Sequence, residues 1–173
     1  MKNAAKLITP VVLGIAVWLG VATALPAASA DRDAATAFAK LKSLSGRWEA
    51  QMGEHKIVTT FEVASNGTAV LERMSGHGVG DMLTIYYLEG SHIVLTHYCA
   101  SGTQPHMVAQ AGRGNDELHF KLAGTSGLTS LDQGHMDEVV VRFDGLDEVN
   151  EDWTWKENGK VGRQVALRYH RVS

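Results

Sequence analysis

The sequence predicts an all-β protein: about ten antiparallel strands in an up-and-down barrel, preceded by one short helix. Apolar and polar residues alternate with a period of two after Gly46, which gives each segment one buried and one solvated face. Pairs typical of tight hairpins, such as Asn66-Gly67 and Asn158-Gly159, separate these segments. A meander of this kind hides its apolar face and its edges when it closes into a barrel. The alternatives are a β-sandwich and a half-open sheet wrapped on the helix.

The first thirty residues have the pattern of a secretory signal peptide. Lys2 and Lys6 precede an apolar run over residues 11–25, and Ala28-Ser29-Ala30 supplies a small-x-small cleavage site. The run is short for a membrane span, which needs about 20 apolar residues. We therefore expect cleavage after Ala30 and a secreted or periplasmic protein, with residues 31–173 forming a single barrel domain and no membrane span.

The next segment, residues 31–45, predicts the helix. Its apolar residues recur at helical spacing and a glycine follows its end. These apolar residues are Ala34, Ala37, Phe38, Leu41 and Leu44. A helix with one apolar face must pack it on something larger, so we expect a lid or plug on the barrel.

The strands follow as segments of alternating polarity. In the first of them Trp48, Ala50 and Met52 alternate with polar neighbours. The connection over residues 124–136 is longer than a hairpin needs and predicts a flap over the barrel mouth. The expected strands cover residues 46–52, 55–64, 68–75, 80–88, 92–100, 106–112, 117–123, 137–144, 147–157 and 162–172.

Composition excludes several classes of function. The formal net charge is −3, and no basic cluster suits nucleic acid or an anionic membrane surface. The single cysteine, Cys99, cannot form an internal disulfide. The eight histidines are spread singly, without the spacing of a structural zinc site. No complete catalytic constellation is visible, so a binding protein is expected rather than an enzyme.

The residues Gly46-Arg47-Trp48 at the start of the first strand, together with an arginine-rich last strand, resemble the calycins. This superfamily of ligand-binding barrels includes the lipocalins and the fatty-acid-binding proteins. The resemblance implies that Gly46 and Trp48 are structural, and that a basic residue of the last strand, Arg168 or Arg171, packs over the tryptophan. Ten strands resemble the fatty-acid-binding proteins or the nitrobindin-type haem barrels more than the eight-stranded lipocalins.

The segment around the cysteine supplies the first candidate site residues. If residues 92–100 form a strand, His97 and Cys99 share its more apolar face and point inward. Inside a barrel, His97 is either a hydrogen-bonded structural residue or part of a ligand site. Cys99 is interpreted as a small apolar filler rather than a nucleophile, because free cysteines are usually buried and no activating cation is evident.

Other candidates come from the neighbouring turn and from aromatic residues on inward faces. Gln104 and Met107 are hypothesised to gather with His97 and Cys99 at one rim. Tyr86, Trp153 and Trp155 lie on strand faces that line either a core or a cavity. The complete set of expected ligand-binding residues is Tyr86, His97, Cys99, Gln104, Met107, Trp153 and Trp155.

Three functions are consistent with these patterns. The first is an exported protein that holds a small apolar or amphipathic molecule, such as a lipid or fatty acid, without a cofactor. The second is a haem barrel that resembles nitrobindin, with His97 or His170 as the iron ligand and Cys99 or Met107 as further donors. The third is a filled barrel whose surface binds a partner protein in the periplasm.

Overall fold

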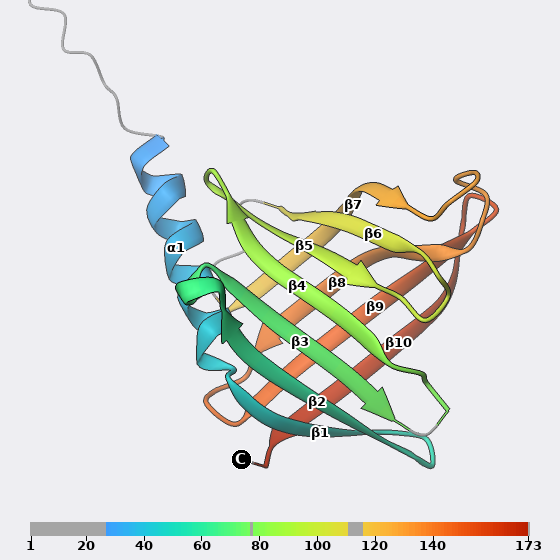
Figure 1. The fold of residues 1–173 in the computed structure, drawn as a ribbon, viewed down its shortest axis with the longest axis horizontal. Coiled ribbons are helices and arrows are strands. Elements are labelled where there is room, and N and C mark those ends of the chain that lie inside the picture. The colour runs from blue at the N-terminus through green and yellow to red at the C-terminus, as the bar shows by residue number, and fades with distance from the viewer. Residues whose placement is uncertain (1–26, 77, 111–115, 173) are drawn as a thin grey trace, which may run out of the picture.

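The computed structural model describes residues 27–76, 78–110 and 116–172. One helix precedes ten strands (Figure 1). Residues 1–26, which hold most of the predicted signal peptide, lie outside the described ranges. The elements are α1 (Ala27–Ser43), β1 (Gly46–Met52), β2 (His55–Ala64), the 3₁₀ turn η1 (Ser65–Gly67), β3 (Ala69–Gly76), β4 (Met82–Glu89), β5 (His92–Tyr98), β6 (Gln104–Ala109), β7 (Glu117–Ser126), β8 (His135–Phe143), β9 (Glu148–Glu157) and β10 (Lys160–Arg171).

The ten strands form one closed antiparallel barrel in which each strand pairs with its neighbours in the sequence, and β1 pairs with β10. The predicted all-β barrel with one short helix is therefore confirmed. The turn residues act as expected at the β9–β10 hairpin, where Asn158 and Gly159 have φ angles of 51° and 69°. Positive φ at both positions suits a two-residue hairpin turn that matches the twist of the strands.

The seam between β1 and β10 closes the barrel. Trp48 lies opposite Arg171 in this ladder. The Arg171 guanidinium lies over the Trp48 ring, 4.2 Å from its centre, and its nitrogens donate to the carbonyl oxygens of Ser43 and Ser45 at 2.9 and 2.7 Å. Arg171 thus joins the last strand to the first strand and to the end of α1. Arg168, the other candidate for this position, points outward and pairs with Asp152 at 2.7 Å.

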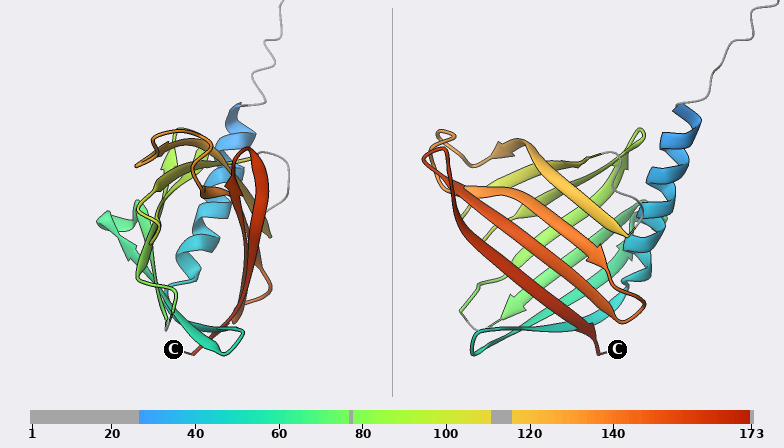
Figure 2. Two further views of the ribbon diagram at one scale, coloured as in Figure 1. Left: turned by 90° about the vertical axis from the view of Figure 1, so that its right-hand side faces the viewer. Right: turned by 180° about the vertical axis from the view of Figure 1, so that it is seen from behind.

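Helix α1 covers one end of the barrel. Seen from the opposite end, it crosses behind the ring of strands (Figure 2). Its apolar face is buried at Ala37, Phe38 and Leu41, and Leu44, directly after the helix, is buried as well. No helix in the described ranges is long and apolar enough to cross a membrane. The helix plugs this end because its apolar stripe and the inward residues of the strands exclude water together.

Candidate ligand cavity

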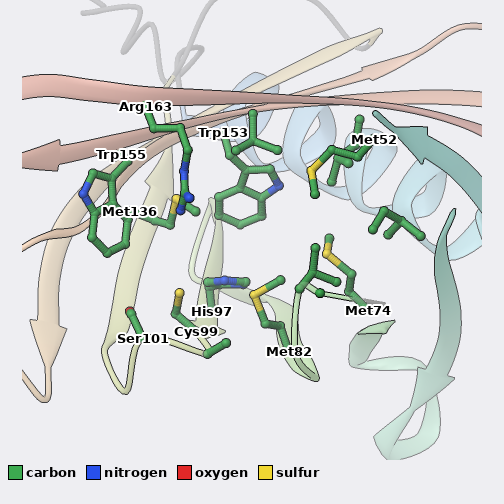
Figure 3. Close-up of a pocket in the computed structure, with 16 residues that line it drawn as sticks. Met52, Met74, Met82, His97, Cys99, Ser101, Met136, Trp153, Trp155 and Arg163 are labelled. Atoms are coloured by element: carbon green, nitrogen blue, oxygen red, sulfur yellow. The ribbon is translucent and has the colours of Figure 1, made fainter. Parts of the chain in front are cut away.

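A cavity of about 330 Å³ lies inside the end of the barrel that faces away from α1. Its volume is at the lower end of the range usual for small-molecule sites, about 300–1,000 Å³. Hairpins and parts of β1, β2, β3, β4, β5, β8, β9 and β10 supply its wall (Figure 3). The lining residues are Met52, Ile57, Met74, Gly78, Val79, Met82, His97, Cys99, Ala100, Ser101, Met136, Trp153, Trp155, Arg163, Val165 and Leu167.

Among the described residues, His97 is the one histidine in this lining, and it is only 2% exposed. Its Nδ1 lies 2.9 Å from Oγ1 of Thr84, and its ring lies against Trp153 with ring centres 4.5 Å apart. Nε2 has no hydrogen-bond partner in the part of the chain that the structure describes. Burial lowers the pKa of His97 to about 4, so the imidazole is neutral at pH 7.

Thr84 limits the choice of tautomer for His97. Its Oγ1 can either donate to Nδ1 or accept from Nδ1–H, depending on which ring nitrogen carries the proton. In the tautomer that donates Nδ1–H to Thr84, the lone pair of the neutral imidazole lies on Nε2, the nitrogen without a partner among the described residues.

Two buried carboxyl groups lie on inward faces of β3 and β9. Glu72 is 1% exposed and Glu151 is fully buried. Tyr86 donates its hydroxyl to Oε2 of Glu72 at 2.7 Å, and Trp153 donates Nε1–H to Oε2 of Glu151 at 3.0 Å. The second oxygen, Oε1, has no partner within residues 27–76, 78–110 and 116–172 in either carboxyl group.

Both carboxyl groups have raised pKa values, which favour their neutral forms. Burial raises the pKa of Glu72 to about 7. Burial raises the pKa of Glu151 well above its ordinary value, and the negative charge of Glu72 raises it further. No lysine or arginine in the described ranges forms an ion pair with either group. The interior next to His97 is therefore polar but carries no compensating cation.

The structure brings four of the seven predicted ligand-binding residues to the cavity: His97, Cys99, Trp153 and Trp155. Cys99 is half-buried in the cavity wall rather than enclosed in the core. Tyr86 and Met107 are fully buried but do not line the cavity. The pocket hypothesis for these two residues is corrected to a core position.

Gln104 lies outside the barrel wall. It lines a surface groove with Thr96, Tyr98 and His106, and its amide donates to the carbonyl of Gly102 at 3.2 Å. The reason is the period of the strand: Met107 points inward, so a residue three positions earlier points outward. His170, the other predicted haem ligand, is exposed on the outer face of β10.

The predicted flap is shorter than expected and does not cover the cavity. β7 continues to Ser126 and β8 begins at His135, so only residues 127–134 connect them. None of these residues lines the cavity. The connection instead docks beside the β9–β10 hairpin, where the amide of Asn158 donates to the carbonyl of Asp132 at 2.9 Å.

Sequence reasoning missed the two carboxyl groups and the methionines of the cavity. The two-residue period of the strands could have indicated that both carboxyl groups point inward. Val70, Glu72 and Met74 occupy alternate positions of β3, as Val149, Glu151 and Trp153 do in β9. A glutamate between two inward apolar residues faces inward as well.

The comparisons with known proteins show the fold and not the function. No protein-family model matches the chain, and no curated protein matches it. Among solved structures the chain is similar to Rv2717c from M. tuberculosis, with a TM-score of 0.58 and 15% sequence identity. The match covers 79% of this chain and 98% of that chain. At this identity, the likeness concerns the ten-stranded barrel alone.

Proposed function

We propose that this protein is a calycin-like exported barrel that binds a small, largely apolar molecule in its open end. The observation that carries the proposal is an apolar cavity lined by the neutral ring of His97, whose Nε2 has no partner among the described residues and serves as the acceptor in the tautomer with Nδ1–H. A ligand would gain about 0.8 kcal/mol for each buried CH₂ group, less the cost of its ordering. The packing of Arg171 on Trp48 supports the relation to calycins.

The surroundings of His97 favour a neutral polar group on the ligand over a carboxylate. His97 stays neutral and cannot form an ion pair with an anion at pH 7. The buried carboxyl groups of Glu72 and Glu151 carry no positive charge in either protonation state, so they offer no counter-ion to an anion in the same interior. The cation of the lining, Arg163, is exposed and lies over Trp155, 5.7 Å from its ring centre. A hydroxyl or phenol therefore fits the inner end of the cavity better than the carboxylate of a fatty acid.

The proposal is tested by comparing three probes: 2-naphthol, naphthalene and 2-naphthoate. Isothermal titration should give saturable binding with 2-naphthol tightest, because only its hydroxyl donates to His97. His97→Phe keeps a ring against Trp153 and removes the acceptor. We expect it to weaken 2-naphthol binding by roughly fivefold, since one hydrogen bond contributes about 1 kcal/mol, and to leave naphthalene binding unchanged.

The control is His92→Phe, because His92 is exposed on the outer surface. It should change the affinity for none of the probes. Absence of a saturable site for all three probes would overturn the proposed function. Tightest binding of 2-naphthoate would overturn the preference for a neutral group.

Haem is the second candidate, favoured by the same neutral imidazole. His97 would hold the iron through Nε2, with Nδ1–H directed to Thr84 as an orienting hydrogen bond. A bound haem would supply a site for small gas molecules. Added haem should then give a Soret band that is lost in His97→Phe and kept in His170→Ala. An unchanged free-haem spectrum would end this candidate.

The cavity itself argues against the third hypothesis, a filled barrel that acts only through its surface. A volume of about 330 Å³ is much larger than one water molecule occupies, about 30 Å³.

A further inference from the structure

Three sulfur atoms lie at neighbouring positions on one wall of the cavity. Met74 on β3 pairs directly with Met82 on β4. The β4–β5 ladder ends with Leu83 opposite Tyr98, and Cys99 directly follows Tyr98 as Met82 directly precedes Leu83, so both residues lie at this end of the strand pair. Residues opposite one another on one face have Cβ atoms about 4.5–5.5 Å apart. Figure 3 shows Met74, Met82 and Cys99 along the same side of the cavity.

An imidazole nitrogen lies next to this row. His97 precedes Cys99 by one period of the strand and faces the same cavity. Its Nε2 is buried and has no partner, and its Nδ1 is already held by Thr84. This is the arrangement in which a histidine is ready to act as a metal ligand, because the other ring nitrogen fixes the orientation and the tautomer.

The lining of the cavity is unusually rich in sulfur-containing side chains. Five methionines lie in the described ranges, and four of them line this cavity: Met52, Met74, Met82 and Met136. Methionine is a flexible apolar filler in many cores. A thiol and an unpartnered imidazole beside the thioethers make this group a set of donor atoms, a combination that apolar filling does not require.

The chemistry of these donors selects a soft metal. Thioether and thiolate ligands favour Cu(I), whereas Mg²⁺ and Ca²⁺ need oxygen ligands. No group of three or more His, Cys, Asp and Glu residues in the described ranges could hold a metal ion, so the lining does not suit zinc. A monovalent ion also costs less to bring into an apolar cavity than a divalent one.

We propose that Met74, Met82, Cys99 and His97 form a binding site for a soft monovalent metal ion, Cu(I). Binding exchanges the thiol proton of Cys99 for the metal, and this proton leaves to solvent. The positive ion and the thiolate then neutralise each other within the apolar cavity. This site is a second use of the cavity and goes beyond the binding of an apolar molecule.

The test uses Ag(I), a redox-stable probe with the ligand preferences of Cu(I), added to the full chain labelled with ¹³C at the methionine methyl groups. We expect one equivalent to bind, with shifts of the Met74 and Met82 methyl resonances and with quenching of tryptophan fluorescence. Anaerobic competition with bicinchoninate should show binding of one Cu(I). Shifts confined to methionines other than these two, or the absence of stoichiometric binding, would overturn the proposal.

Matched leucine variants separate the metal site from the apolar cavity. Leucine has nearly the volume of methionine and no donor atom, so folding is little affected. Met74→Leu with Met82→Leu should weaken Ag(I) binding at least tenfold, whereas Met52→Leu with Met136→Leu should weaken it less than threefold. An unchanged urea denaturation curve of the first variant would show that the barrel is intact. Equal Ag(I) affinity of both double variants would overturn the metal site without affecting the proposed function.

Discussion

Replacing Trp48 with alanine is expected to lower the free energy of unfolding by about 3–5 kcal/mol, as measured by urea denaturation. Trp48 is fully buried, packs edge-to-face on Phe61 with ring centres 6.3 Å apart, and donates its Nε1–H to the carbonyl of Leu44 at 2.6 Å. The change leaves a cavity where the helix meets the seam between the first and last strands. A loss of this size is a large part of the 5–15 kcal/mol that stabilises a typical domain.

Trp155→Ala is the matched control for this prediction. Trp155 is the same residue type, but it is half-buried at the cavity, and its substitution removes no contact at the seam. We expect a loss well below that of Trp48→Ala. Equal losses for the two variants would contradict the view that the Trp48–Arg171 seam anchors the closed barrel.

Replacing Glu72 with glutamine is expected to stabilise the protein by about 3 kcal/mol at pH 8 and by little at pH 4. Burial raises the pKa of Glu72 from 4.5 to about 7 in the folded state, and each pKa unit corresponds to about 1.4 kcal/mol. Glutamine keeps an oxygen that can accept the hydrogen bond from Tyr86, which donates to Oε2 of the carboxyl group at 2.7 Å. Urea denaturation at several pH values measures the difference.

The direction of this pH dependence follows from the protons bound by the folded and unfolded states. Between pH 4.5 and about 7 the folded state holds a proton on Glu72 that the unfolded chain has lost, so the contribution of this group falls as the pH rises. His97 acts in the opposite sense, because its pKa is lowered to about 4 and its neutral form favours the folded state at higher pH. Both proteins contain His97, so its contribution cancels in the difference between their free energies of unfolding.

Glu62→Gln, on the exposed part of β2, is the control for charge removal and should leave the stability profile unchanged. Parallel profiles for wild type and Glu72→Gln between pH 4 and 8 would contradict the assignment of a raised pKa to Glu72. Glu151 strengthens the expected effect, because the negative charge of Glu72 raises the pKa of Glu151 and this influence disappears in the variant.

The strand pattern was predictable because it depends on local geometry. Most expected strand boundaries differ from the observed ones by two residues or fewer, and β1, His55–Ala64 and the Asn158-Gly159 turn agree in full. Alternation also placed His97 and Cys99 on an inward face. The error arose where the two-residue period of the strand was not applied. Gln104 and Met107 were assigned to one site, although they are three positions apart and therefore lie on opposite faces.

The candidate site depended on relations between distant parts of the chain. Whether Arg168 or Arg171 reaches Trp48 is decided by the register of β1 against β10, which joins residues more than 120 positions apart. Burial raises the pKa of Glu151, and the charge of Glu72 raises it further, although Glu151 lies on β9 and Glu72 on β3. Neither relation leaves a trace in a local sequence window.

The sequence by itself determined the secondary structure, the inward face of each strand and the tight turns of the barrel, because φ/ψ preferences and the two-residue period act between neighbouring residues. Only the tertiary structure decided which inward side chains share a space. It placed four methionines, Cys99 and His97 around an unfilled volume and set the carboxyl groups of Glu72 and Glu151 in the same interior. The physical reason is that cavity volume and desolvation depend on the packing of side chains from all ten strands at once.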